Sequence, residues 1–417
     1  MGKKIAVIGG GAAGMTAAIR AAELGANVTV YEGNDRVGKK ILSTGNGKCN
    51  FSNENMSPDC YYGSGKVLVD KLYRSFGVTE TKDFFSGLGM RIKNRDGYLY
   101  PASGQASTVL DVLRYELERL GVRIHTDSRA TSIVAEKDGP AVSANGHKTR
   151  KYDAVILACG GKAAPKTGSD GQGFLLAESL GHRIVPTVPA LVALRCSESF
   201  YKRVSGVRCD ARLTLHIDGQ PVRSDRGEMQ WTDYGISGIP VFQLSRVAAY
   251  ALQEKQSVTI EIDLMPDLAE KTQNDADSAF WDERWKRQGD QSMEHFVTGL
   301  VNKKIALLLL KLAGIKESER AENVPVSQRK ALTKLFRSFT VTVNGTNSYD
   351  QAQVCAGGID CSEVTDTLES RIVPGVFFAG EILDIDGICG GYNLQWAWSS
   401  GFVAGEAASK DCGKENR

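Results

Sequence analysis

The chain has 417 residues, of which 42% are hydrophobic and 24% charged, so at roughly 150 residues per domain we expect two or three globular domains. The 51 basic and 49 acidic side chains leave a formal net charge of +2, which argues against nucleic acid or an anionic membrane as partner. Nine cysteines without a CxxC pair or a secretory signal indicate reduced thiols and a cytoplasmic location. A small molecule is the expected substrate. No oligomeric state follows from the sequence.

The first thirty residues have the pattern of a βαβ unit. Residues 4–8 form a short apolar run typical of a buried parallel strand, and residues 12–24 read as a helix that Gly25 ends. Residues 27–31 are the next strand. The unit predicts a doubly wound nucleotide domain.

A glycine fingerprint lies between the first strand and the helix. Gly9, Gly11 and Gly14 give GxGxxG, with Ala12 and Ala13 opening the helix, so we expect a pyrophosphate at the helix N-terminus. Glu32 ends the second strand, where a carboxylate accepts hydrogen bonds from ribose hydroxyls and repels a 2′-phosphate. The motif therefore predicts FAD or NAD rather than NADP. The alternative is a structural turn with a surface glutamate.

A second segment, residues 38–50, concentrates glycines, lysines and amides (GKKILSTGNGKCN). Its backbone N–H groups are suited to wrapping a flavin, although a solvated basic loop is the alternative. Cys49 is a candidate redox thiol if Lys48 lowers its pKa. The expected cofactor contacts here are Gly38, Lys39, Lys40, Thr44, Gly45, Asn46, Gly47, Cys49 and Asn50.

The middle of the chain changes pattern twice. Residues 109–120 predict a helix, and 122–125, 130–135 and 152–158 predict strands, the last running into Cys159, Gly160 and Gly161. Residues 207–217, 258–264 and 339–343 then alternate apolar with polar side chains, as half-buried antiparallel strands do. The stretch 267–337 reads as helical, with Ser327 as an expected N-cap and 305–310 as a packed helix face rather than a membrane span.

The C-terminal region returns to the first pattern, with a strand over 372–379 and a helix over 394–409. Gly380 and Glu381 follow the strand, where a carboxylate is placed to hold a ribityl or pyrophosphate-linked hydroxyl. Gly391 precedes the helix, whose N-terminus is expected to face the flavin carbonyl and stabilise negative charge on the reduced ring. Asp384 and Asp386 lack the rest of a calcium loop, so no metal is predicted. The remaining expected cofactor contacts are Ala130, Asp386, Tyr392, Asn393 and Leu394.

Together these segments resemble the HI0933-like flavoproteins, also called the aminoacetone oxidase or BaiN type. The segments GGGAAG, GKKILSTGNGKCN, LACGG, YGISGIP, TLESR and AGEILDIDGICGGYNLQWAWSSGFVAG carry the likeness across almost the whole chain. The resemblance implies an α/β fold with a discontinuous Rossmann-like FAD domain (1–188 and 350–417). It also implies an inserted β-barrel-like substrate domain (189–266 and 338–349) and a helical subdomain (267–337).

The same resemblance implies an oxidoreductase with tightly bound FAD and two possible reactions. One is NADH- or NADPH-driven reduction of a conjugated C=C bond, as in steroid or bile-acid intermediates; the other is oxidation of a small amine by oxygen. Asp233 stands where the family often has histidine, and Ile239 is inserted before the proline of that segment. The Asp233-Tyr234 departure suggests a pocket unlike that of the amine oxidases and favours the reductase. Tyr234, Tyr392 and Asp233 are the candidate catalytic residues, with a tyrosine as proton donor. A non-catalytic flavin-binding partner of a protein or RNA, and a plain NAD dehydrogenase, are the alternatives of other classes.

Overall fold

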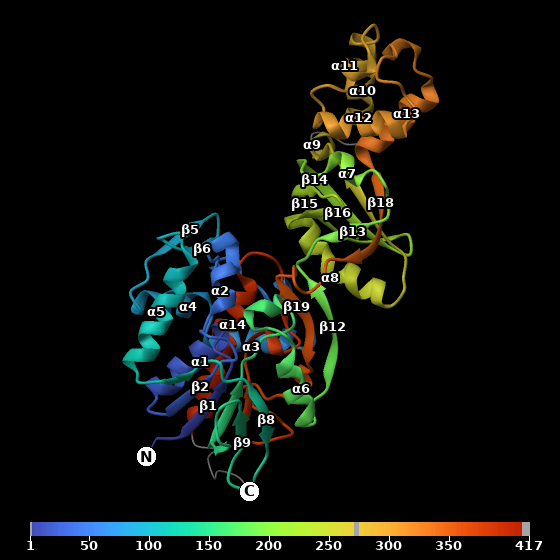
Figure 1. Ribbon diagram of the computed structural model, residues 1–417. Helices are drawn as coiled ribbons and strands as arrows, with labels where there is room; N and C mark the ends of the chain where they lie inside the picture. The colour runs from blue at the N-terminus through green and yellow to red at the C-terminus, as the bar shows by residue number, and fades with distance from the viewer. Residues whose placement is uncertain (1, 271–274, 411–417) are drawn as a thin grey trace. The chain divides into compact units, whose positions relative to one another are not determined.

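The computed structural model describes residues 2–270 and 275–410, which divide into two compact units (Figure 1). One unit comprises the chain up to Val188 together with the chain from Ala352 on, and the other is Pro189–Gln351. The fold prediction is confirmed, because a Rossmann-like α/β unit built from both ends of the chain is interrupted by a β-barrel that carries helices.

A five-stranded parallel sheet in the order β20-β11-β1-β2-β7 forms the centre of the first unit. Its strands are β1 (Lys4–Ile8), β2 (Asn27–Tyr31), β7 (Arg123–His125), β11 (Ala154–Leu157) and β20 (Val376–Phe378). β20 is shorter than the sequence predicts, because Pro374 has no N–H for a sheet ladder and Gly375 turns the chain at φ +77°. The shared carboxyl edge of these strands is where an open α/β sheet binds nucleotides.

Two long helices, α1 (Ala12–Glu23) and α14 (Tyr392–Ser409), pack together and join the ends of the chain. A Cβ added at Gly401 or Gly405 of α14 would lie 2.4 Å from the carbonyl oxygen of Ala13 or Ala17 of α1. The two backbones can therefore approach only because α14 has glycine at these positions. Helix α5 (Ala106–Arg119) also packs on α1 and begins three residues earlier than the sequence predicts.

Smaller elements surround this sheet, and most of them escaped sequence analysis because they are short. The helices are α2 (Lys39–Ser43), α3 (Lys66–Ser75), α4 (Val78–Gly87) and α6 (Gln172–Ser179). The remaining strands form separate small sheets. Two of these sheets have three strands: β3 (Ser52–Asn53), β6 (Tyr98–Pro101) and β5 (Ile92–Arg95) form one, and β8 (Ala130–Val134), β9 (Ala141–Ala144) and β10 (Arg150–Lys151) form the other. Two have two strands: β12 (Ile184–Ala190) with β19 (Val354–Ile359), and β4 (Tyr61–Tyr62) with β21 (Asp386–Gly387).

The second unit is built on a closed barrel in the order β13-β16-β15-β14-β17-β18. Its strands are β13 (Leu194–Cys196), β14 (Arg208–Ile217), β15 (Gln220–Trp231), β16 (Gly235–Gly238), β17 (Val258–Asp263) and β18 (Phe339–Thr346), and α8 (Ile239–Gln253) packs on them. The predicted alternation in β14 is present, with Ala211, Leu213 and Leu215 fully buried. Asp218 and Gly219 both have positive φ, as a tight hairpin turn after β14 requires.

Most helices of the second unit, including α8 and the short α7 (Tyr201–Val204), share one hydrophobic core with the barrel, in which Trp231, Phe336 and Leu309 are fully buried. The helices that follow β17 are α9 (Pro266–Glu270), α10 (Asp275–Arg287), α11 (Met293–Val297), α12 (Lys303–Leu312) and α13 (Val326–Arg337), of which α10 to α13 contribute to this core and gather at one end of the barrel (Figure 1). The Ser327 N-cap prediction is wrong: Pro325 occupies the cap position, and the cap has no side-chain hydrogen bond. Among the described residues no helix is both long and apolar enough to cross a membrane.

Candidate functional site

The glycine fingerprint forms the turn between β1 and α1 at the carboxyl edge of the sheet. Gly9 has φ +101°, and a Cβ there would lie 2.6 Å from the carbonyl oxygen of Ala158 at the end of β11. A Cβ at Gly14 would lie 1.9 Å from the carbonyl oxygen of Gly9. Both glycines are therefore required by the fold of the turn itself.

Gly11 differs, because a Cβ added there meets no atom within 4 Å. It is the N-cap residue of α1, and no side chain caps this helix. The first N–H groups of α1, beginning at Ala12 and Ala13, thus have no capping side chain and lie at the positive end of the helix dipole beside open space, which suits a phosphate group.

Glu32 is buried beside this turn. One carboxylate oxygen accepts a hydrogen bond from the Gly10 N–H at 2.8 Å, and the other accepts from the backbone and side-chain nitrogens of Asn34, each at 2.8 Å. Each carboxylate oxygen has more than one lone pair, so these contacts fix the group while leaving acceptor capacity for ribose hydroxyls.

The segment 38–50 is held by partners that the sequence did not reveal. Lys39 pairs with Asp35 at 2.6 Å and Lys40 with Glu381 at 2.6 Å, so both ammonium groups have carboxylate partners. Gly45 and Asn46 have left-handed backbone angles, and the Thr44 hydroxyl donates to the Ile41 carbonyl at 2.6 Å. Gly38 and Gly47 also have positive φ.

Cys49 does not meet the requirement for a redox thiol. Its side chain is fully buried, and burial raises the pKa of the thiol to about 12 although a hydrogen bond from Thr44 acts in the opposite direction. A redox role required that Lys48 lower this pKa, and that condition is not met. Burial likewise raises the pKa of Cys159 to about 12. No disulfide joins cysteines in the described part of the chain.

Glu381 connects three segments that lie far apart in sequence. Besides the ion pair with Lys40, its carboxylate accepts from the backbone N–H of Cys355 at 2.7 Å and of Gly161 at 3.4 Å. A Cβ at Gly161 would meet Cys355, and one at Gly160 would meet Ser169, so protein atoms fill the space beside both glycines.

The glycines before α14 lie on the segment 50–53. A Cβ at Gly391 would lie 2.6 Å from the Ser52 carbonyl oxygen and 3.0 Å from the Asn50 side-chain oxygen, and Asn53 donates to the Gly390 carbonyl at 2.9 Å. Helix α14, like α1, begins at a glycine without a side-chain cap. Gly380 brings the C-terminal region to the fingerprint, because a Cβ there would lie 2.9 Å from the Ala13 Cβ.

Side chains at the start of α14 mostly brace the loop before it. Asn393 accepts from the Gly387 N–H at 2.8 Å and donates to its carbonyl at 2.9 Å, and Tyr392 donates to the Asn55 carbonyl at 3.1 Å. Asp386 is buried in β21, and Leu394 is half-buried. Ala130 is buried at the start of β8.

The residues present fit a dinucleotide with an isoalloxazine end. Three segments converge: the turn at residues 9–14, the loop 44–53 and the C-terminal stretch 380–393, and two uncapped helix N-termini belong to them. The Asn50 side-chain oxygen is buried without a hydrogen-bond partner. A buried polar atom without a partner costs free energy, so a donor on a bound group would satisfy it.

The candidate residues Tyr234 and Asp233 lie in the second unit, between β15 and β16. Asp233 is exposed. The Tyr234 hydroxyl oxygen accepts a hydrogen bond from the side-chain nitrogen of Asn347 at 2.8 Å, and the Arg195 guanidinium lies 5.3 Å from the Tyr234 ring centroid. Sequence analysis missed Arg195 and Asn347, since nothing in the sequence links positions 152 residues apart.

The histidines, which showed no pattern in the sequence, form contacts in the fold. His182 lies between Glu363 at 3.0 Å and the Ser370 hydroxyl at 2.8 Å, as in a hydrolase triad. Its side chain is inaccessible, and Ser370 accepts from the backbone N–H groups of Ile372 and Val373, so the group is structural. In the described residues no cluster of His, Cys, Asp or Glu is arranged to hold a metal ion.

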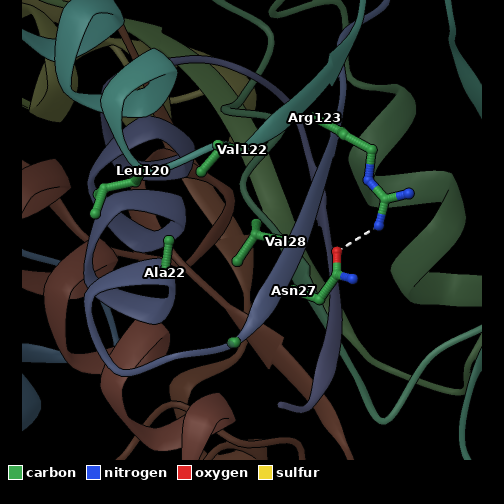
Figure 2. Close-up of a pocket in the computed structure, with 8 residues that line it drawn as sticks. Ala22, Asn27, Val28, Leu120, Val122 and Arg123 are labelled. Carbon is green, nitrogen blue, oxygen red and sulfur yellow. Dashed lines mark hydrogen bonds between the residues drawn. The ribbon is translucent and has the colours of Figure 1, made fainter. Parts of the chain in front are cut away.

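A surface pocket of about 440 Å³ lies at the amino end of β2 and β7 (Figure 2). Ala22, Val28, Leu120 and Val122 line it, and Arg123 donates to the Asn27 side-chain oxygen at its edge. Nucleotides bind at the opposite, carboxyl edge of such sheets, so this pocket has no part in the candidate site.

A family model described as HI0933-like protein Rossmann domain matches residues 3–407. The chain belongs to the HI0933-like family. This is the family that the motifs at both ends of the chain resemble, and the predictions of the family and of an FAD-dependent oxidoreductase are confirmed.

Several curated proteins are similar to this HI0933-like chain over nearly its whole length. The 3-dehydro-bile acid delta(4,6)-reductase of Clostridium scindens is 42% identical, covering 98% of this chain and 99% of its own. The ribosomal RNA dihydrouridine synthase of Haemophilus influenzae is 29% identical, covering 97% and 98%. Its counterpart from Escherichia coli is 28% identical, covering 96% of each chain.

Among solved structures, 3-ketosteroid-delta4-(5alpha)-dehydrogenase from Rhodococcus jostii RHA1 has a TM-score of 0.50 at 17% identity. The match covers 98% of this HI0933-like chain and 97% of the other. At this identity the likeness concerns the fold alone.

Proposed function

We propose that the protein reduces a carbon–carbon double bond conjugated to a carbonyl group in a small, hydrophobic, steroid-like substrate, with bound FAD and with NADH or NADPH as donor. The observation that carries this proposal is the 42% identity, over 98% of the chain, to a protein named as a bile-acid delta(4,6)-reductase. The oxidoreductase class and the substrate type follow from the same relative.

The more distant relatives support the same type of reaction. A dihydrouridine synthase saturates the ring double bond of uracil, which is conjugated to a carbonyl, as the double bonds of a steroid dienone are. Different substrates thus share one electrophile: a C=C bond whose β-carbon accepts a hydride while the carbonyl oxygen gains negative charge.

FAD, when bound, supplies the hydride carrier for this reaction. The chain's own part is to hold it: the N-terminus of α1 at Gly11–Ala13 for the pyrophosphate, Glu32 for the ribose, and the N-terminus of α14 at Gly391–Leu394 for the flavin carbonyl. The loop 38–50 would hold the ring system, and the Asn50 oxygen would accept a hydrogen bond from a ring N–H.

Of the two candidate tyrosines, the hydrogen bonds favour Tyr234 as the group that acts on substrate. The Tyr392 hydroxyl donates its proton to the Asn55 carbonyl, and burial raises the pKa of this phenol above its ordinary value. Tyr234 instead accepts from Asn347, which leaves its own proton available. Asp233 is exposed and is a candidate for contact with polar parts of the substrate.

A uridine in ribosomal RNA is the second candidate substrate, because two relatives carry that name. Their identity to this chain is lower, and 51 basic against 49 acidic side chains give little overall attraction to RNA. We therefore place the steroid-like enone first. Amine oxidation by oxygen predicts the opposite result in the experiment below.

The first experiment mixes the purified holoprotein anaerobically with NADH or NADPH and follows the flavin absorbance. We expect rapid bleaching, because a reductase takes its electrons from the nicotinamide. Adding a steroid dienone should restore the absorbance and give a product with two more hydrogens, whereas a saturated ketone of the same skeleton should not.

Each other outcome identifies a different activity. A flavin that neither nucleotide bleaches, but that a small primary amine bleaches, contradicts the reductase proposal and supports the oxidase. The third outcome is that an unmodified ribosomal RNA transcript reoxidises the reduced flavin while the dienone does not. If the digested RNA then contains dihydrouridine, the substrate is RNA.

A further inference from the structure

Three side chains from separate segments of the second unit form one hydrogen-bonded group around Tyr234. Arg195 is on β13, Tyr234 precedes β16, and Asn347 directly follows β18. Asn347 donates to the Tyr234 hydroxyl oxygen at 2.8 Å, and the Arg195 guanidinium donates to the Asn347 side-chain oxygen at 3.4 Å. Asn347 is 5% exposed, whereas Tyr234 is half-buried and Arg195 exposed.

The chemistry of these groups gives the hydrogen bonds a direction. A guanidinium has only donors, so the Asn347 oxygen must face Arg195 and its NH₂ group must face Tyr234. An amide NH₂ also only donates, so the tyrosine oxygen is the acceptor in that contact. The Tyr234 proton therefore points elsewhere, and no acceptor for it is present among the described residues.

The backbone keeps this arrangement in place. The pairing register of β13 with β18 shifts between Arg195 and Cys196, a bulge of the kind that redirects a side chain. A Cβ at Gly235 would lie 2.2 Å from the Leu194 carbonyl oxygen, so the Tyr234–Gly235 segment lies directly against β13. The Asn347 N–H donates to the Ala193 carbonyl at 3.0 Å.

We propose that Tyr234 donates a hydrogen bond to the carbonyl oxygen of the substrate, and that Arg195 and Asn347 are positioning residues that keep the tyrosine proton directed at that oxygen. The inference rests on the proposed function, because it names the group that recognises the conjugated carbonyl. The donor stabilises the negative charge that develops on this oxygen as the β-carbon is reduced. No covalent bond to the protein forms.

The decisive variant is Asn347→Asp, which keeps the shape of the side chain but replaces the donor with a carboxylate. The carboxylate accepts from Arg195 and from the Tyr234 hydroxyl, so it takes up the proton that the substrate needs. We expect Asn347→Asp to lose about 10²-fold in enone reduction, as much as Tyr234→Phe, by analogy with the loss of one oxyanion donor. The double variant Tyr234→Phe/Asn347→Asp should lose no more activity than either single variant, because both changes remove the same hydrogen bond from Tyr234 to the substrate.

Asn344→Asp is the matched control, since Asn344 is exposed on β18 and gains the same charge. Its rate should equal that of the wild type. Arg195→Met is the alternative variant if Asn347→Asp folds poorly. Without the Arg195 donor the Asn347 amide is free to flip, so Arg195→Met should lower kcat. Arg195→Lys restores a donor and should recover part of the lost kcat. Far-UV circular dichroism and bound-flavin content check that each variant is folded.

A binding measurement separates this inference from the proposed function. Calorimetry on the oxidised holoprotein without nucleotide compares a steroid enone with the same steroid lacking the carbonyl oxygen. We expect the wild type to prefer the enone by about threefold to tenfold, and Tyr234→Phe and Asn347→Asp to lose this preference while Asn344→Asp keeps it.

The outcomes differ for the two claims. A wild type that reduces no enone but shows this pattern of binding contradicts the proposed function and leaves the carbonyl site standing. Enone reduction that is unchanged in Asn347→Asp overturns the inference, as does a wild type that binds both steroids equally or neither.

Discussion

At the scale of single residues, Gly11 and Gly14 have different requirements although they belong to one motif. Gly14 touches the Gly9 carbonyl, whereas Gly11 faces open space and has an ordinary negative φ of −80°. The motif alone does not reveal this difference, because each glycine meets different atoms once the turn has formed.

We expect Gly11→Ala and Gly14→Ala to separate cofactor binding from folding. Gly14→Ala should lower the free energy of unfolding by about 1–3 kcal/mol, because its Cβ would be forced into the turn. Gly11→Ala should keep the stability of the apoprotein but weaken FAD binding, since its methyl group occupies the space in front of α1. Urea unfolding of the apoproteins and fluorescence titration with FAD measure the two effects; equal FAD affinity in Gly11→Ala and wild type would place the pyrophosphate elsewhere.

At the scale of elements, the Glu381 side chain holds three segments together. They are the helix α2, the start of β19 and the loop that follows β11. The sequence showed a carboxylate after a strand and suggested that it holds the cofactor directly. The structure shows protein partners for both carboxylate oxygens, because Lys40, Cys355 and Gly161 reach it only after the two ends of the chain have come together.

Replacing Glu381 with alanine should therefore loosen this junction. We expect Glu381→Ala to lower the free energy of unfolding by about 1–3 kcal/mol, because it leaves buried N–H donors without acceptors. Glu381→Gln, which keeps an oxygen for the Cys355 N–H, should recover part of the loss. Urea unfolding of the apoprotein tests this without the added stabilisation from bound FAD, and equal stability of the alanine variant and wild type would show that the junction does not depend on this carboxylate.

At the scale of the whole molecule, two histidines of the first unit, the buried His182 and the half-buried His125, give stability a pH dependence. Burial lowers the pKa of both His125 and His182 below the ordinary value, with the neighbouring His147 adding to the effect on His125 and Glu363 opposing it on His182. The unfolded chain takes up these protons at about pH 6.5 while the folded chain resists them. Stability is therefore full above that pH and declines as the pH falls through it.

Urea unfolding at pH 7.5 and pH 5.5 should thus give a lower midpoint at the acidic pH. The double variant His125→Asn/His182→Gln should show a smaller decline, and His295→Asn, at an exposed position, should behave as the wild type does. A decline of the same size in the double variant would assign the pH dependence to other groups.

The sequence by itself determined the βαβ unit, the FAD-type fingerprint, the family and the interruption of the nucleotide domain by a β-rich insertion. These follow from local periodicity and from glycines at fixed spacing, which act within a few residues of chain. The barrel was only partly visible, because β15 is mostly polar and lacks an apolar alternation, and β13 and β16 have only three and four residues.

Only the tertiary structure decided which side chains meet. The Lys40–Glu381 pair spans 341 positions and the Asn347–Tyr234 contact spans 113. The burial that raises the pKa of Cys49 likewise depends on what packs around it. Such contacts depend on where the barrel closes and on how the last helix packs against the first, and neither leaves a periodic signal in the sequence.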